Sequence, residues 1–271
     1  MIPLKNGKAI PQIGFGTSPL NDRDVVPAVI AAIEAGYRHI DTAYKYNNQR
    51  GVGQGIRDGG IPREDLFVTT KLDGQFQGDD RAIAGLEESL QQLGMDYVDL
   101  LLIHWPLPQR DQYVPTWNTF EKLLAAGKTL SIGLSNFKPA HIERLLAETS
   151  VRPAVNQIQL NPRITRPEQR AYNSEQGIVT EAWSPLGAGN ELLQDPTLMT
   201  IAAKYDKTPA QVVLRWHIEL SIVAIPRSRN PRRIAENIDI FDFALTEDEV
   251  AAISALDTGE EPRVDSDRTG H

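Results

Sequence analysis

The stretch Val98-Asp99-Leu100-Leu101-Leu102-Ile103-His104 is the strongest indication of the fold. Its continuous apolar centre between polar ends is typical of a strand that is buried on both faces. An amphipathic pattern follows over residues 114–126, and a second short apolar run occupies residues 129–135. A strand, a helix and a strand in this order predict a parallel pair joined by a crossover helix.

The same alternation continues in both directions along the chain. Further strands are predicted at 14–17, 37–41, 66–71, 154–160, 178–182 and 222–226. Helical patterns separate most of them, at 25–35, 80–93, 139–148, 166–175, 197–205 and 209–220. An open doubly wound sheet also alternates in this way, but eight consecutive units favour an α/β fold closed as a single (β/α)8 TIM barrel.

Two additions flank the predicted barrel. Residues 4–10 carry an Asn6-Gly7 pair, which is typical of a tight hairpin turn. Residues 242–256 resemble the end of a strand followed by an extra helix, with Thr246 as N-cap and Glu249 at capping-box spacing. The polar tail after Asp257 is predicted to be a loop. We expect residues 1–271 to form one barrel domain.

The composition restricts the classes of partner. The 28 Lys and Arg residues against 36 Asp and Glu residues give a net charge of −8, the wrong sign for binding nucleic acid through the overall field. There is no cysteine, which excludes thiol chemistry and fits a reducing compartment. No apolar run is long enough to span a membrane, and the first residues do not resemble a signal peptide. We expect a cytoplasmic protein with a small-molecule substrate.

Four polar residues stand at or just after the ends of predicted strands, namely Asp41, Tyr46, Lys71 and His104. Catalytic groups of such barrels collect where the strands end, so we expect all four at one mouth. An ammonium group near the phenol would lower its pKa, a carboxylate would keep the lysine charged, and a neutral imidazole could donate to a carbonyl oxygen. Each residue alone has an ordinary structural interpretation, but together they favour carbonyl reduction.

These residues lie in motifs that resemble the aldo-keto reductase family and occur in the family's order. The motifs are Gly36-Tyr37-Arg38-His39-Ile40-Asp41-Thr42-Ala43, Thr70-Lys71-Leu72, His104-Trp105-Pro106, Gly133-Leu134-Ser135-Asn136-Phe137, Val155-Asn156-Gln157, Trp183-Ser184-Pro185-Leu186-Gly187, Ile225-Pro226-Arg227-Ser228 and Arg233-Ile234-Ala235-Glu236-Asn237. The resemblance covers nearly the whole chain and is greatest to the bacterial 2,5-diketo-D-gluconate reductase group.

The resemblance implies an NADPH-dependent oxidoreductase. Its substrates would be aldehydes, ketones, α-dicarbonyls or keto sugars such as 2,5-diketo-D-gluconate, reduced to alcohols by direct hydride transfer. Tyr46 would be the general acid, Asp41 and Lys71 would tune it, and His104 would orient the carbonyl. The family also suggests a monomer. A metal is not expected, because the five histidines show no helical ligand pair.

The resemblance also assigns the cofactor contacts. The carboxamide would be held by Ser135, Asn136 and Gln157, and Trp183 would stack on the nicotinamide, although as a single residue it could equally be core packing. Ser184, Leu186 and Gly187 would follow the pyrophosphate, Arg227, Ser228 and Arg233 would bind the 2′-phosphate, and Glu236 and Asn237 would reach the adenine. The alternative for the arginines is a solvated helix start.

Three features need separate comment. Gly51-Val52-Gly53-Gln54-Gly55 lacks the G-x-G-x-x-G spacing, so we interpret it as helix packing. Asn47-Asn48-Gln49-Arg50 departs from the family's Gly-Asn-Glu-Glu, which predicts a different local network. Ser18 stands where relatives often carry an aromatic residue and is expected to leave the pocket wall open, while Trp105 would form an apolar wall.

Two other functions remain open on the sequence. A barrel hydrolase would use two carboxylates, but Asp41 has no obvious acidic partner. A sensor or regulatory protein could bind NADPH without turning it over, and the complete set of four catalytic residues argues against this.

Overall fold

The computed structural model describes residues 1–187, 189, 191–259 and 264–270, and it contains the predicted barrel. The strands are β3 (Phe15–Gly16), β4 (His39–Asp41), β5 (Phe67–Leu72), β6 (Leu100–Ile103), β7 (Ile132–Ser135), β8 (Val155–Gln159), β9 (Val179–Trp183) and β10 (Val223–Ile225), all paired in parallel and in chain order. The sheet closes because the amide of Gly14 donates to Ala224 O (2.9 Å) and that of Gly16 donates to Pro226 O (2.9 Å).

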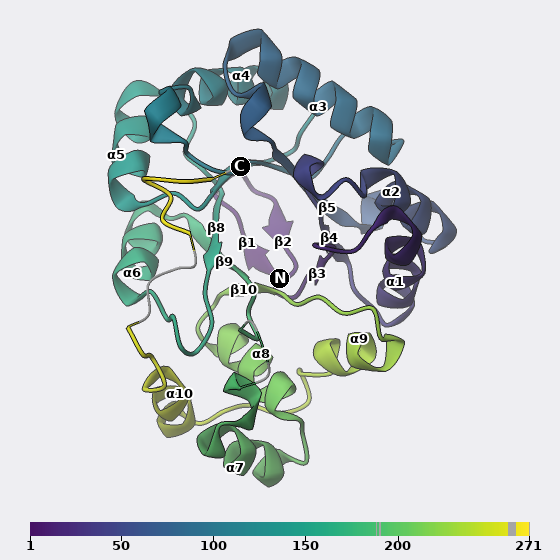
Figure 1. Cartoon of the computed structure of the whole chain (residues 1–271), viewed down its shortest axis with the longest axis vertical. Helices are drawn as coiled ribbons and strands as arrows, with labels where there is room; N and C mark the ends of the chain where they lie inside the picture. Colours follow the sequence, from purple (N-terminus) through teal and green to yellow (C-terminus); the bar gives the residue numbers. More distant parts are fainter. Residues whose placement is uncertain (188, 190, 260–263, 271) are drawn as a thin grey trace.

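Helices surround the strands (Figure 1). They are α1 (Asp22–Glu34), α2 (Gln49–Asp58), α3 (Asp79–Leu93), α4 (Tyr113–Ala125), α5 (Pro139–Glu148), α6 (Pro167–Gln176), α7 (Pro196–Tyr205), α8 (Pro209–Glu219), α9 (Pro231–Ile238) and α10 (Glu247–Ser254). Short 3-10 helices add η1 (Tyr44–Tyr46), η2 (Arg63–Asp65), η3 (Gly74–Phe76), η4 (Pro108–Arg110) and η5 (Leu192–Gln194). All eight predicted strands are confirmed, whereas the sequence reading gave no bounds for α2 and α9.

The glycine cluster lies in α2 and packs closely against neighbouring helices. A Cβ atom at Gly51 would stand 2.5 Å from the backbone oxygen of Asp22, and one at Gly55 would stand 2.8 Å from Cβ of Val29. At Gly53 a Cβ would collide with the backbone oxygen of Leu93. These glycines therefore allow α2 to approach α1 and the end of α3, which confirms the interpretation as helix packing.

An N-terminal hairpin closes the end of the barrel away from the strand carboxyl termini. Strands β1 (Ile2–Pro3) and β2 (Ala9–Ile10) pair antiparallel, and Gly7 adopts φ of 81° in the turn between them. In Figure 1 the hairpin lies across the centre of the ring of strands. Leu4 and Ile10 belong to the apolar cluster that fills this end of the barrel. The predicted hairpin is thus confirmed, and it closes this end of the barrel.

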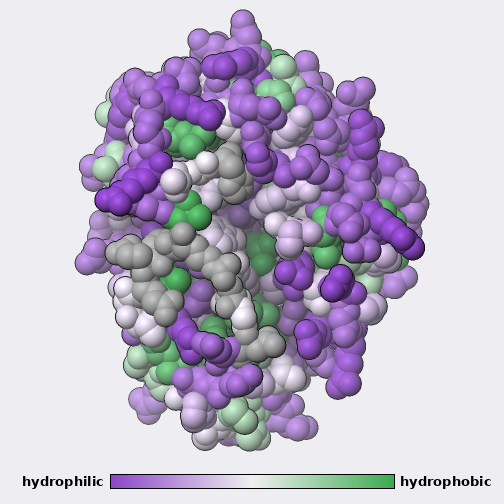
Figure 2. Space-filling view, in the orientation of Figure 1, coloured by the Kyte–Doolittle hydropathy of each residue, from purple (hydrophilic) through white to green (hydrophobic). Residues whose placement is uncertain are grey.

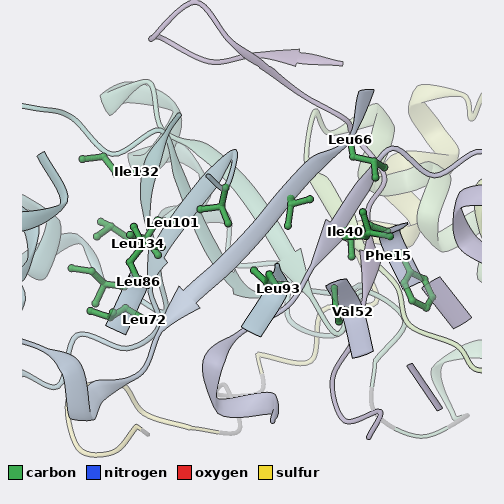
Figure 3. Packing of buried hydrophobic residues seen from close by; sticks show 14 of the residues in the cluster. Phe15, Ile40, Val52, Leu66, Leu72, Leu86, Leu93, Leu101, Ile132 and Leu134 are labelled. Atoms are coloured by element: carbon green, nitrogen blue, oxygen red, sulfur yellow. The ribbon is translucent and has the colours of Figure 1, made fainter. Parts of the chain in front are cut away.

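A larger apolar layer lies between the strands and the helices. Outward-facing strand residues such as Ile40, Leu101 and Leu134 pack with Leu86 and Leu93 of α3 (Figure 3). Strand residues alternate between this layer and the barrel interior, because successive side chains of a strand point to opposite faces. The chemistry-bearing residues occupy the interior set.

The region before α10 differs from the prediction. No strand forms over residues 242–246. The physical reason is that β3 and β10 hydrogen-bond to each other, so the closed sheet leaves no edge for another strand. The predicted capping box is confirmed, since the Thr246 amide donates to Glu249 Oε2 (2.8 Å) and the Glu249 amide donates to Thr246 Oγ1 (3.2 Å). None of the described helices is long and apolar enough to cross a membrane.

Candidate active site

A cavity of about 570 Å³ opens at the carboxyl ends of the strands. Figure 2 shows this face with a central hollow and a mainly hydrophilic rim. The wall includes thirteen of the residues predicted from the sequence: Ser18, Asp41, Tyr46, His104, Trp105, Ser135, Asn136, Gln157, Trp183, Ser184, Leu186, Gly187 and Arg227. Gly16, Pro19, Pro185, Gly189, Ile225 and Pro226 complete it.

A buried ion pair lies at the base of this cavity. Lys71 Nζ donates to both carboxylate oxygens of Asp41, at 2.6 and 2.8 Å, and to the carbonyl oxygen of Thr42 at 3.0 Å. Lys71 has no solvent exposure. Burial is the largest single influence and lowers the pKa of Lys71, but the charge and hydrogen bonds of Asp41, together with Tyr46 and Glu181, outweigh burial and leave that pKa raised. The lysine is therefore held as an ammonium group.

Tyr46 receives a hydrogen bond from this ammonium group. It belongs to η1, directly after β4, and its Oη lies 3.2 Å from Lys71 Nζ. Burial raises the pKa of the phenol, with Lys71 opposing and Asp41 reinforcing that shift. Lys71 lowers this pKa as expected, but removal of the phenol from water outweighs the ammonium charge and leaves the pKa raised. Tyr46 is therefore protonated at neutral pH.

His104 stands beside Tyr46 at the cavity wall. The two rings meet edge to face with centroids 5.7 Å apart, and the His104 ring stacks at 6.4 Å on Trp105. His104 directly follows β6, and its amide donates to Leu72 O (3.3 Å) at the end of β5. The barrel thus brings Lys71 and His104, which are distant in sequence from Asp41 and Tyr46, to the same mouth as those two residues.

Three polar side chains line the neighbouring wall. Ser135 Oγ donates to Gln157 O (3.1 Å), and Asn136 Nδ2 donates to Ser135 Oγ (3.0 Å) and His104 O (3.1 Å). Asn136 adopts φ of 64°, a conformation that asparagine tolerates better than most residues. Trp183 Nε1 donates to Asn136 Oδ1 (2.9 Å). The indole is therefore fixed at the cavity wall rather than placed in the apolar core.

The predicted phosphate-binding cluster lies at the entrance to α9. Arg227 is exposed and lines the cavity, and Arg233 is exposed on the helix. Ser228 is buried and its Oγ accepts a hydrogen bond from the Asn230 amide (3.0 Å). Glu236 is bound to Arg232 (2.8 Å).

Lys71, Ser228, Arg233, Glu236 and Asn237 stand outside the cavity wall. Lys71 lies directly beneath it. The other four lie on α9 or just before it, adjoining Arg227 in the chain.

Residues 47–50 include Asn48, which matches the family pattern, and Gln49, which departs from it, and both side chains form hydrogen bonds near the site. Asn48 is buried, accepts from Thr42 Oγ1 (3.0 Å), and donates to Thr17 O (3.0 Å) and Leu20 O (2.8 Å). Its amide therefore ties the loop after β3 to the loop that carries Tyr46. At the departing position Gln49, the side chain accepts from Thr70 Oγ1 (2.7 Å) and donates to Gln92 Oε1 (3.2 Å). Ser18 is exposed at the wall and fills little of it.

Sequence reasoning missed a second buried acid. Gln157 Nε2 donates to Asp41 Oδ2 (2.8 Å) and to Glu181 Oε2 (2.7 Å). The expectation that Asp41 has no acidic partner is therefore wrong, because β4, β8 and β9 all point these side chains into the barrel. Glu181 is absent from the cavity wall and has no exposure, so it cannot act on a glycoside as a second carboxylate. Its position two residues before Trp183 in β9 was the available signal.

The described part of the tail, residues 264–270, packs beside the cavity and is called the roof below. Lys138 Nζ bonds to Asp265 (2.7 Å), and His141 Nε2 bonds to Asp267 Oδ1 (2.9 Å). Gly270 approaches Trp105 and Leu107 so closely that a Cβ atom there would stand 2.9 Å from each side chain. Among the described residues, no group of three acidic or histidine side chains is arranged to hold a metal.

Comparison with known proteins agrees with this geometry. The model of the aldo/keto reductase family matches residues 12–258. An aldo-keto reductase of Mycolicibacterium smegmatis is 48% identical over 258 residues, covering 95% of this chain and 94% of the relative. The methylglyoxal reductase DkgA of Salmonella typhimurium is 42% identical, covering 100% and 98%. A crystal structure of a Gox0644 variant in complex with NADPH superposes with a TM-score of 0.95 at 39% identity, covering 100% and 98%.

The fold and the site define a barrel oxidoreductase. The chain belongs to the aldo/keto reductase family, and as such it acts on carbonyl groups with NADP(H). The match to DkgA confirms the resemblance to the bacterial 2,5-diketo-D-gluconate reductase group.

Proposed function

We propose that this protein reduces aldehydes, ketones, α-dicarbonyls or keto sugars with NADPH and that Tyr46 donates the proton. The observation that carries the proposal is the Lys71 ammonium group, fixed by Asp41 at 2.6 Å and pointing at Tyr46 Oη at 3.2 Å. Because a relative is a methylglyoxal reductase, small α-dicarbonyls are the first substrates to test.

The donors and acceptors at the wall fit the nicotinamide end of the cofactor. Ser135, Asn136 and Gln157 offer the hydroxyl and amide groups that a primary amide requires, and Trp183 presents an indole fixed by Asn136. NADPH supplies the hydride when bound. Arg227 is placed at the cavity to meet a phosphate, and a guanidinium can bind phosphate oxygens in pairs.

Further along the cofactor, we propose the contacts that the family pattern assigns. Ser184, Leu186 and Gly187 follow the pyrophosphate, Ser228 and Arg233 assist Arg227 at the 2′-phosphate, and Glu236 and Asn237 face the adenine. Release of Arg232 from Glu236 would accompany that last contact.

The four residues at the mouth have distinct tasks. Tyr46 is a phenol because of its burial, so it carries the proton that the carbonyl oxygen acquires. Lys71 donates to that phenol and stabilises the phenolate left after transfer. Asp41 holds Lys71 charged and in place. His104, beside Tyr46, orients the carbonyl oxygen toward the phenol.

Other properties follow from the composition and from the resemblance to the family. We infer a single-domain monomer of the cytoplasm that needs no metal and binds neither nucleic acid nor membranes. A chelator that removed activity would contradict the absence of a metal.

The test is NADPH consumption against a panel of α-dicarbonyls, aldehydes and keto sugars, with Tyr46→Phe alongside. We expect kcat of Tyr46→Phe to fall by about 10²–10⁴-fold, the usual contribution of general acid catalysis. Tyr44→Phe is the matched control, because Tyr44 lies in the same 3-10 helix but donates to Glu88 (2.8 Å) instead.

The outcomes separate the functions. Full activity in Tyr46→Phe would overturn the assigned acid. Tight NADPH binding without turnover on any carbonyl of the panel would favour the sensor.

A further inference from the structure

Glu181 is an acidic residue at the centre of the barrel that the proposed reaction does not use. It lies in β9, with Gln157 of β8 and Val223 of β10 as its neighbours in register. Its side chain has no exposure. A buried carboxyl group costs stability unless it is neutral or hydrogen-bonded, so its presence needs a physical reason.

The hydrogen bond between Gln157 and Glu181 constrains which end of the Gln157 side-chain amide faces the two acids. A glutamine side chain has a donor end, the NH2 group, and an acceptor end, the oxygen. Here the NH2 group is enclosed by two carboxyl groups, with Asp41 Oδ2 at 2.8 Å and Glu181 Oε2 at 2.7 Å. The reversed amide would set its oxygen against the Asp41 carboxylate and lose that hydrogen bond, and it would keep one to Glu181 only if the proton of that acid moved to Oε2. The two acids thus determine an orientation that is otherwise ambiguous for glutamine.

The acceptor end of Gln157 is the end left for the cavity. Gln157 belongs to the cavity wall, whereas Glu181 does not. The protein therefore presents an oxygen at this position rather than an NH2 group. An oxygen can accept from the NH2 group of a primary amide, and it cannot bind the amide's own oxygen.

The charges facing Glu181 explain how two acids can share one amide. From β4 it faces Asp41 and His39, whose Nε2 lies 3.8 Å from Glu181 Oε1, and from β5 and η1 it faces Lys71 and Tyr46. Burial and then the Asp41 charge raise the pKa of Glu181 to about 8. Burial lowers the pKa of His39 to about 3, so that ring is neutral. The positive charge of Lys71 then balances the negative charge of Asp41, and Glu181 is a neutral acid.

We propose that Glu181 is a positioning residue: together with Asp41 it fixes the Gln157 amide so that the glutamine oxygen accepts from the NH2 group of the nicotinamide carboxamide. This inference rests on the proposed function, since it concerns the same cofactor site. It assigns to the interior of β9 a part in setting the orientation of the nicotinamide ring.

The experiment compares binding of NADP⁺ with that of its acetylpyridine analogue, in which a methyl ketone replaces the primary amide. The ketone cannot donate a hydrogen bond, so it does not benefit from the Gln157 oxygen. Dissociation constants are measured by quenching of tryptophan fluorescence, since Trp105 and Trp183 line the cavity. We expect wild type to bind NADP⁺ roughly three- to tenfold more tightly than the analogue, the value of one hydrogen bond.

The variants test whether Glu181 causes this preference. Glu181→Met keeps the length of the side chain but removes the acceptor, and we expect its preference to fall within about twofold of unity. Glu181→Gln is the conservative control, because its amide oxygen can still accept from Gln157, and it should keep the preference. If Glu181→Met does not fold, Glu181→Thr replaces it, since the threonine hydroxyl is too short to reach Gln157.

Each outcome is informative. An unchanged preference in folded Glu181→Met, or an equal loss in Glu181→Gln, would overturn the positioning role. If wild type bound neither dinucleotide, the proposed function would be refuted. If wild type reduced carbonyls but bound NADP⁺ and the analogue equally well, only the role of Glu181 would be refuted.

Discussion

At the end closed by the hairpin, the barrel interior is filled by apolar side chains, whereas at the cavity end it holds ionisable and amide groups. The apolar set is Leu4, Ile10, Phe67, Leu100, Leu102, Val155 and Val223, and the polar set is Asp41, Lys71, Gln157 and Glu181. Both sets are buried, and strands β5 and β8 contribute to each. The apolar end contributes stability through burial, while the polar end has to recover the cost of desolvating its charges. The difference teaches that the buried Lys71–Asp41 ion pair lies at the end of the barrel where Lys71 also donates to Tyr46.

The largest effect should follow from removing the cation of the polar set. Lys71→Met leaves the Asp41 carboxylate buried without its partner, which costs about 3–5 kcal/mol of unfolding free energy. It also removes the donor to Tyr46, so kcat should fall by at least about 10²-fold. Urea unfolding and steady-state kinetics measure both. Lys45→Met, at an exposed lysine of the same loop, should change neither.

A substitution in the apolar set should separate stability from activity. Leu100→Ala removes a fully buried side chain below the charges and should cost about 2–5 kcal/mol of unfolding free energy. Because Leu100 does not belong to the cavity wall, kcat of the folded variant should stay within about threefold of wild type. A tenfold loss of kcat at a temperature where the variant is folded would show that the two ends are coupled.

The pH dependence of stability tests the protonation of Glu181. Its pKa is about 8 in the folded protein against 4.5 ordinarily, so between those values the native state binds a proton that the unfolded state has released. Raising the pH from 5 to 8 should therefore destabilise wild type relative to Glu181→Gln, on the order of 3 kcal/mol. Thermal unfolding at both pH values measures the difference.

The comparison with Glu181→Gln is needed because two buried histidines act in the opposite direction. Burial lowers the pKa of His39 to about 3 and that of His217 to about 4, so both favour folding as the pH rises toward 6.5. These contributions are common to both proteins and cancel. Equal pH dependence in the two proteins would mean that Glu181 is ionised in the barrel.

The smallest effect concerns the roof, which lies outside both sets. Lys138→Ala removes the ion pairs to Asp265 and Asp267, which are partly exposed and so contribute little. We expect KM for the carbonyl substrate to rise about two- to fivefold, with less dependence on salt than in wild type. Steady-state kinetics at low and high salt measure this, with Lys122→Ala on α4 as the control. An unchanged KM would show that the tail does not shape the pocket.

The sequence was sufficient for the barrel because the signal is repeated. Eight apolar runs separated by amphipathic stretches leave few alternatives, and local periodicity reports burial directly. The bounds of α2 were not predicted because Gly51, Gly53 and Gly55 lower helix propensity, and their close packing depends on neighbours distant in sequence. A strand before α10 was wrongly predicted because a local sequence pattern cannot show that the sheet is closed. The closed sheet leaves no edge at which another strand could pair.

For the site, the sequence indicated which residues lie together but not how their contacts shift their pKa values. The strand ends predicted that Asp41, Lys71 and His104 share a mouth. The direction of the Tyr46 pKa depends on the competition between burial and the Lys71 charge, which requires the three-dimensional structure. Glu181 was not predicted because it lies outside the cavity wall, and it is connected to the site through its hydrogen bond with Gln157.

The hairpin that seals the far end of the barrel also limits the route by which solvent protons reach the interior. With Lys71, His39 and Glu181 fully enclosed and the far end stoppered by Leu4 and Ile10, solvent protons can reach these groups only from the cavity side. A bound dinucleotide would stand across that route. While the cofactor is bound, the interior would then lose only the proton that Tyr46 donates to the substrate. Because the oxidised cofactor leaves in every cycle, Tyr46 would regain that proton from the cavity side once per turnover, at the pH of the assay.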